Sequence, residues 1–269
     1  MIITPQYTVP EIIGYINANM TQLQVFGTLA NVLAYVQVIY GVWVGFRDRS
    51  HAIPLIATAM FFAHDTYYVL NYDYWTHTIN HPFFNANMIA MAIFVCLELV
   101  LIWQIITYSR KEVGLGESKL QAFISYVAIQ VGVYIMFLWF RSMMGDPLYL
   151  ECFAVSIVFS NLFNIPMLMR RGSRKGQSLV IAWALAIQTG PVGFFMVHPF
   201  LGPYFMQPTW IAAGIANTVL AFVYLWMLYR APRYSRGTAG QRSTGLAPAA
   251  IATREADHCT MKFKRRSLP

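Results

Sequence analysis

The stretch FFAHDTYYVLNYDYW, residues 61–75, decides how many times this chain crosses a membrane. It places His64 and Asp65 inside a run that is otherwise apolar and aromatic. Across the whole chain, apolar residues make up 57% of the 269 residues, and charged residues make up only 11%. The apolar residues fall in blocks of roughly 20 residues, the length of a helix that crosses a bilayer. This composition predicts an all-α, polytopic membrane protein.

Seven apolar blocks are long enough to span as helices, and the block that contains Asp65 is the shortest and most polar of them. The blocks cover 24–46, 52–71, 83–107, 120–141, 149–169, 178–201 and 208–229. We therefore expect a seven-transmembrane-helix bundle within residues 24–230. An interfacial segment at 1–23 precedes it, and a basic, disordered tail at 231–269 follows it.

The basic residues test this count. With seven spans, one side of the membrane receives the basic segments 47–49, 110–119, 170–175 and the chain from Arg230, whereas the other side receives only Arg141. The positive-inside rule then predicts an N-terminus outside and a C-terminus in the cytoplasm. The net charge of +8 follows from this topology and from attraction to anionic lipid. We therefore expect no nucleic-acid partner.

Asp65 lies within the second predicted span. A charged carboxylate in hydrocarbon costs roughly 2.5–3.5 kcal/mol on insertion scales, so such a group faces the bundle interior, finds a partner or stays protonated. Desolvation favours the protonated form, which has a proton to donate. The neighbours of Asp65 on a helical face include Phe61 and Tyr68, with Tyr72 two turns on, whereas His64 is expected to point elsewhere. Asp65 is either a general acid or a structural hydrogen-bonding group.

Other polar residues also fall within predicted spans. Glu98, in the third span, is either a second acid or base or a group that bonds one helix to another. The amides Asn161, Asn164, Gln188 and Asn217 either hold helices together or line one cavity.

Motifs for metals and cofactors are missing. His77 and His81 have i, i+4 spacing, but their segment has no third ligand nearby, so we predict no metal site. The sequence has no G-x-S-x-G elbow, no Walker loop, no dinucleotide fingerprint and no aspartate-rich D-D-x-x-D cluster. We therefore expect no cofactor, and acid–base chemistry if the protein is an enzyme.

Aromatic residues make up 16% of the chain, and several of them, such as Phe61 and Trp183, fall within predicted spans. An aromatic face stabilises a cation by roughly 0.5–2 kcal/mol. An apolar cavity lined by such rings, with one protonated acid, suits carbocation chemistry. Ordinary packing is the alternative interpretation of each ring.

Two stretches carry a resemblance to a known family. AMFFAHDTYYVL, residues 59–70, and NLFNIPMLMRRGSRKGQSLVIAWALAIQTG, residues 161–190, resemble segments of the small seven-helix terpene cyclases. These are the pyripyropene and paspaline type of fungal meroterpenoid and indole-diterpene biosynthesis, with their bacterial relatives. Asp65 stands where the family has glutamate, and His64 replaces its tryptophan. The family's acid in the last helix has no counterpart, since that helix offers only Asn217.

The resemblance implies a membrane-bound terpene cyclase, an isomerase or lyase that protonates an epoxide or alkene on a prenyl chain and needs no metal. It implies Asp65 as general acid, Tyr68 as the residue that orients it, and Glu98 or Asn217 as part of a proton relay. The substrate-binding residues would be Phe61, Tyr72, Asn161, Asn164, Trp183, Gln188 and Asn217.

The same resemblance implies partners and a location. The hydrophobic prenylated substrate would enter from the lipid bilayer, and a prenyltransferase and an epoxidase would be neighbours in the pathway. The membrane would be the endoplasmic reticulum in a fungus or the plasma membrane in a bacterium.

Two other classes stay open. Asn164-Ile165-Pro166, followed by a basic segment and Gly-Gln-Ser, also resembles the PQ-loop and sugar-efflux carriers, in which Pro166 would be a hinge. A membrane subunit without enzymatic activity would fit the missing acid in the last helix.

Overall fold

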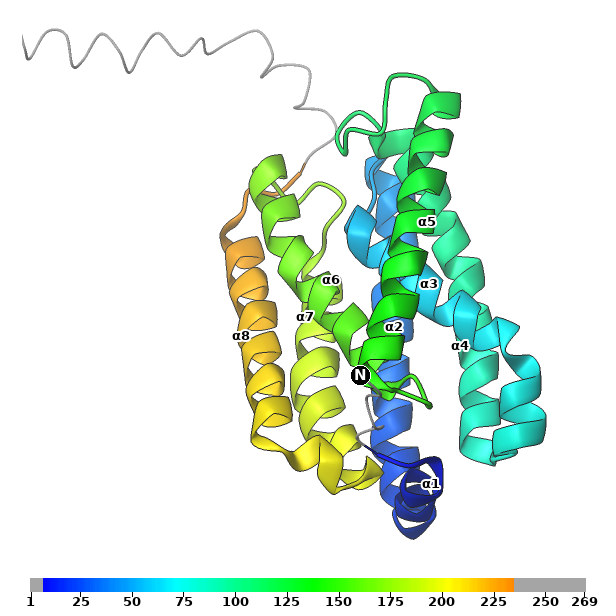
Figure 1. Cartoon of the computed structure of the whole chain (residues 1–269). Helices are drawn as coiled ribbons and strands as arrows, with labels where there is room; N and C mark the ends of the chain where they lie inside the picture. Colours follow the sequence, from blue (N-terminus) through cyan, green and yellow to red (C-terminus); the bar gives the residue numbers. More distant parts are fainter. Residues whose placement is uncertain (1–6, 235–269) are drawn as a thin grey trace, which may run out of the picture. The chain divides into compact units, whose positions relative to one another are not determined.

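The computed structural model describes residues 7–234, and every regular element in that range is a helix (Figure 1). The all-α class is therefore confirmed. The described residues up to Arg233 form one compact unit. The expected tail lies, from residue 235 onward, outside the described residues, as do residues 1–6 of the expected interfacial segment.

The α-helices alternate with short π and 3₁₀ segments. The α-helices are α1 (Val9–Ala18), α2 (Met20–Asp48), α3 (Leu55–Leu70), α4 (Pro82–Gln104), α5 (Lys119–Met144), α6 (Leu150–Arg171), α7 (Leu179–Ile187) and α8 (Pro208–Arg230). The π segments are η1 (Tyr74–Ile79), η2 (Ile105–Ser109) and η3 (Gln188–Val197), and the 3₁₀ segments are η4 (His198–Leu201) and η5 (Pro203–Met206).

Among the described residues, six helices have the length and apolar composition of membrane spans. They cover Met20–Asp48, Pro82–Ser109, Lys119–Met144, Leu150–Arg171, Leu179–Leu201 and Pro208–Arg230. These helices make the chain a multi-pass membrane protein by length and composition. The helix that carries Asp65, α3, has 16 residues and is therefore about 24 Å long, against about 30 Å for a bilayer core.

Local sequence explains where the long helices begin and end. Ser118 and Ser178 cap α5 and α7, because each hydroxyl oxygen accepts a hydrogen bond from a first-turn backbone N–H. Gly145 and Gly172 end α5 and α6 in the left-handed conformation, which glycine adopts without strain. Pro166 lies inside α6 and does not end it.

The short helix α3 is surrounded by α4, α5 and α6 and so lies inside the bundle (Figure 1). On the other side, α7 packs between α2 and α8. The outward surfaces are strongly apolar, as on α5, where Phe123, Ile135 and Trp139 are exposed. Large apolar surfaces of this kind face lipid in a membrane protein, and the inward surfaces of α2, α3 and α4 are left to enclose the site.

Arg171, the last residue of α6, ties three loops together. Its Nε donates to Glu112 Oε1 at 2.7 Å, and its Nη1 donates to the carbonyl oxygen of His51 at 2.9 Å. Nearby, Asp48 at the end of α2 accepts a hydrogen bond from the backbone N–H of Gly176 at 2.9 Å. The loops that follow α2, η2 and α6 are therefore held together at one end of the bundle.

Asp146 organises the opposite end, where α6 begins. Its carboxylate accepts from the backbone N–H groups of Leu150 at 3.0 Å and Cys152 at 2.8 Å, and from the hydroxyl of Tyr7. Burial, together with the neighbouring Asp146 carboxylate, raises the pKa of Tyr7 above its ordinary value, so that this hydroxyl stays a donor. The start of the described chain is thereby fixed to the loop between α5 and α6.

Candidate active site

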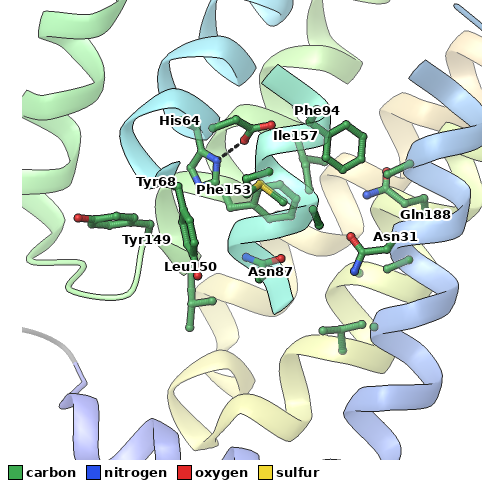
Figure 2. A pocket seen from close by; sticks show the side chains of 18 of the residues that line it. Asn31, His64, Tyr68, Asn87, Phe94, Tyr149, Leu150, Phe153, Ile157 and Gln188 are labelled. Atoms are coloured by element: carbon green, nitrogen blue, oxygen red, sulfur yellow. Dashed lines mark hydrogen bonds and ion pairs between the residues drawn. The ribbon is translucent and has the colours of Figure 1, made fainter. Parts of the chain in front are cut away.

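A cavity of about 580 Å³ lies among α2, α3, α4, α6 and η3. On α2 alone, residues from Met20 to Val38 contribute to its wall, a stretch about 27 Å long. The cavity is therefore elongated along the helix bundle, and its volume is in the ordinary range for sites that bind small molecules. Figure 2 shows His64 and Tyr68 on one side of it and Asn31 and Gln188 on the other.

Three titratable side chains meet in the wall formed by α3 and α4. The Nδ1 atom of His64 lies 2.6 Å from Oδ1 of Asp65. The carboxyl group of Glu98, on α4, neighbours that of Asp65, and its Oε2 atom is buried with no hydrogen-bond partner among the described residues. All three line the cavity, and none is more than 4% exposed. The structure therefore brings together the two acids that the sequence singled out.

Asp65 and Glu98 are acids buried side by side in the wall of one cavity. Two ionised carboxylates so placed would repel each other strongly in a dry site, which favours a proton on one of them. The cavity wall thus carries a carboxylic acid that can donate to a bound molecule.

His64 was expected to point away from Asp65, and that expectation was wrong. Its ring lies 5.2 Å from Phe153 and 5.9 Å from Phe137, centroid to centroid, and these contacts hold it beside the carboxyl group. Its Nε2 atom is buried and has no hydrogen-bond partner among the described residues. The adjacency of histidine and aspartate in an apolar run was the only sequence signal for this contact.

Tyr68 does not take the role expected of it. Its hydroxyl donates to the carbonyl oxygen of Phe84 at 3.4 Å, and its ring stacks on Trp75 at a centroid distance of 4.0 Å. Tyr68 therefore builds the wall of the cavity, while His64 is the residue in hydrogen-bonding contact with Asp65.

Aromatic rings cover much of the remaining wall. The rings of Phe61, Phe94, Phe153 and Tyr149 line the cavity together with that of Tyr68. They come from α3, α4, α6 and the residue before α6, so they surround the space rather than form one stripe. Such an arrangement places several electron-rich faces around a bound apolar chain.

The other predicted binding residues divide into two groups. Phe61 and Gln188 line the cavity. Tyr72 and Trp183 are half exposed, at 53% and 50%, and do not line it. The three asparagines are considered separately, because they are buried elsewhere.

Asn161, Asn164 and Asn217 are buried among the helices and do not line the cavity. The Nδ2 atom of Asn161 donates to Oδ1 of Asn217 at 2.7 Å and to the hydroxyl of Thr189 at 2.9 Å. Asn217 in turn donates to the carbonyl oxygen of Thr189 at 3.2 Å. These bonds join α6, α8 and η3, so Asn161 and Asn217 hold helices together, which was the alternative interpretation of the amides.

Sequence reasoning missed the polar residues of α2. Gln24, Thr28, Asn31 and Gln37 line the cavity along one helix. The first three follow i, i+4, i+7 spacing within an apolar span, and this pattern was the signal that could have revealed them.

The charge of the lining is one-sided. The residues that line the cavity include the acids Asp65 and Glu98 but no lysine and no arginine. Within residues 7–234, no group of three or more His, Cys, Asp or Glu residues is placed to hold a metal ion. Comparisons of the chain with protein-family models, curated proteins and solved structures found no match. The chemistry of the cavity is therefore the basis for assigning a function.

Proposed function

We propose that this protein is a membrane-bound terpene cyclase, which starts ring closure of a prenyl chain by proton transfer. The observation that carries the proposal is the pair of neighbouring, buried carboxyl groups of Asp65 and Glu98 in the wall of an elongated, aromatic cavity. A protonated acid beside a large apolar space is what acid-initiated cyclisation requires.

The reaction begins when the carboxylic acid donates its proton to an epoxide oxygen or to an alkene carbon of the substrate. If the substrate is an epoxide, its C–O bond breaks as the O–H bond forms, and the electrons of a nearby alkene form the new C–C bond. The cation that remains on the chain then loses a proton. The carboxylate of the pair, with His64 in contact with it, takes up a proton, so the acid is restored and the reaction is an isomerisation.

The aromatic wall supports the cationic stage. Each ring face stabilises a cation within about 6 Å of its centroid by roughly 0.5–2 kcal/mol. The rings of Phe61, Phe94, Phe153 and Tyr149 approach the space from four different segments. A cation that moves along the chain during ring closure would therefore stay near a ring, and water would be excluded from it.

The membrane topology that fits this proposal has seven spans, with the N-terminus outside and the C-terminus in the cytoplasm. In addition to the six long helices, α3 would be a span, the second along the chain. It is shorter than a bilayer core and is surrounded by α4, α5 and α6. A helix that is covered by its neighbours does not have to match the lipid thickness itself. The asymmetry of the basic loops supports the orientation.

The central experiment compares Asp65→Asn with wild type in membranes supplied with an epoxidised prenyl substrate, and products are identified by mass spectrometry. Asparagine has the same shape but carries no acidic proton, so we expect the rate of cyclisation to fall about 10²-fold or more. Asp73→Asn is the matched control, because the Asp73 side chain is 94% exposed and lies just beyond α3.

Full cyclase activity in Asp65→Asn would refute the proposal. Unchanged substrate, with saturable uptake of that substrate into vesicles, would instead identify a carrier of the PQ-loop or sugar-efflux type. Measurement of both product and uptake in the same vesicles separates these outcomes.

A further inference from the structure

A set of polar residues lines the cavity in addition to the acids. It consists of Gln24, Thr28, Asn31 and Gln37 on α2 and Gln188 of η3, and Figure 2 shows Asn31 and Gln188 on the side opposite His64. Gln24 and Thr28 are exposed as well as lining the cavity, so the cavity opens at their end of α2. Polar side chains that face lipid are energetically costly, so their presence at the opening of a cavity indicates a function.

Two members of this polar set are both buried and unpaired. Gln37 is 5% exposed and Gln188 is 6% exposed, and neither side-chain amide has a hydrogen-bond partner in the part of the chain that the structure describes. Two other glutamines of the helices donate through their amides, although Oε1 of Gln104 and the whole amide of Gln177, in the loop after α6, have no partner among the described residues. The Nε2 atom of Gln104 donates to the carbonyl oxygen of Val42 at 2.8 Å, and that of Gln130 donates to the carbonyl oxygen of Ala59 at 3.0 Å. The free amides of Gln37 and Gln188 therefore face the cavity with unused donors and acceptors.

The charge of the lining limits what these amides can bind. Among the lining residues no lysine or arginine is present to neutralise a phosphate or diphosphate, and the nearby acids would repel one. An amide donates and accepts in a fixed geometry without charge, which matches a hydroxyl or carbonyl group. A purely hydrocarbon chain would leave both amides unpaired.

We propose that Gln37 and Gln188 bind a neutral hydroxyl or carbonyl group of the substrate, and so position its apolar chain against the carboxyl pair in the wall of the same cavity. This inference rests on the proposed function, because it assigns a polar group to the molecule that the acid protonates. The substrate is then an amphiphile that carries a neutral oxygen group, and neither a diphosphate nor a hydrocarbon.

The test is equilibrium binding to the full-length protein in lipid nanodiscs, with farnesol, farnesyl diphosphate and farnesene as probes. None of these probes carries an epoxide, so binding is measured apart from epoxide-initiated turnover. We expect farnesol to bind roughly tenfold more tightly than either of the other probes, since only farnesol offers the neutral group that the amides need.

Gln37→Met and Gln188→Met keep an unbranched side chain of similar length and remove the amide. We expect each to weaken farnesol binding roughly 5- to 10-fold and to leave farnesene binding unchanged. Gln22→Met is the matched control, because Gln22 is an exposed glutamine of α2 that does not line the cavity. Farnesene binding also reports whether each variant is folded.

Wild-type preference for farnesol in both variants, or tighter binding of the diphosphate to the wild type, would overturn the inference. A failure of the proposed function gives a different pattern. In that case farnesol binding still depends on Gln37 and Gln188, but no cyclised product forms in the membranes that test Asp65→Asn.

Discussion

The Nδ1 atom of His64 lies 2.6 Å from a carboxylate oxygen of Asp65, the next residue in the chain, and both side chains are buried at the cavity. Consecutive side chains on a helix point roughly 100° apart, so such a contact forms only when both turn toward the space between them. Phe137 and Phe153 pack against the imidazole and hold it there. The contact couples the orientation of the two side chains.

His64→Phe tests this coupling. Phenylalanine keeps the ring contacts with Phe137 and Phe153 but cannot hydrogen-bond to Asp65. We expect kcat to fall about 10- to 100-fold with little change in KM, because His64 positions the acid. His77→Phe is the control, since the His77 side chain is 73% exposed. A wild-type kcat in His64→Phe would contradict the assigned role.

Tyr68→Phe should affect stability rather than catalysis. The Tyr68 hydroxyl donates to the carbonyl oxygen of Phe84 and not to Asp65, so we expect a loss of about 1 kcal/mol in the free energy of unfolding and an unchanged kcat. Thermal unfolding and turnover of the same preparations check both parts. Tyr72→Phe, at an exposed position, should change neither quantity. A large fall in kcat for Tyr68→Phe would restore the orienting role that the sequence had indicated.

Gly176→Ala should destabilise the loop cluster around Arg171. Gly176 has a φ of +67°, and an added Cβ would lie 2.6 Å from the carbonyl oxygen of His51 and 2.9 Å from Nη1 of Arg171. Gly172 is the control, because its φ of +57° is similar but nothing lies within 4 Å of its added Cβ. Both variants carry the strain of a left-handed alanine, roughly 1–2 kcal/mol, and Gly176→Ala adds about 1–3 kcal/mol of overpacking. Unfolding in denaturant measures the difference, and equal destabilisation would contradict the packing described here.

The burial of His51 beside cationic side chains leads us to expect a loss of stability in mild acid. Burial, and then the charges of Arg171, Arg170 and Lys175, hold the pKa of His51 well below its usual range. The ring accepts a hydrogen bond from Arg171 Nη2 at 2.9 Å, which requires an unprotonated nitrogen. The unfolded chain takes up a proton at His51 below about pH 6.5, whereas the folded chain does not, so stability falls as the pH drops through that value.

The expected slope for this one group is up to about 1.4 kcal/mol per pH unit. Unfolding measured between about pH 5 and 7 checks it. His51→Gln keeps a hydrogen-bond acceptor for Arg171 and has no titration, so the difference between the variant and wild type isolates His51. An identical pH dependence in both proteins would contradict the prediction.

Much of the fold could be predicted because the membrane imposes simple rules on sequence. Apolar blocks of bilayer length mark helices, and six of the seven expected blocks coincide with helices of spanning length and composition. The block at 52–71 is also a helix, Leu55–Leu70, but a shorter one. Asp65 and Glu98 could be singled out in the same way, because an acid within an apolar span is costly and so is seldom present without a use.

The relations between residues of different helices could not be predicted. Asp65 and Glu98 meet only because α3 packs closely against α4, and no local pattern specifies that register. Asn161 and Asn217 bond to each other instead of lining the cavity, because α6 and α8 pack together at that level. Trp183 lies on an exposed face of α7, and that face too is set by how α7 packs against its neighbours.

By itself, then, the sequence determined that this protein is built for a lipid bilayer and that it is helical. It also singled out two acids, because a charged carboxylate is costly in hydrocarbon. Only the tertiary structure decided that those acids neighbour each other, that His64 turns toward Asp65 and that polar residues of α2 line the same cavity. The physical reason is that hydropathy measures the preference of each residue for lipid or water. Contacts between side chains of different helices depend instead on how the helices cross and on which faces they turn inward.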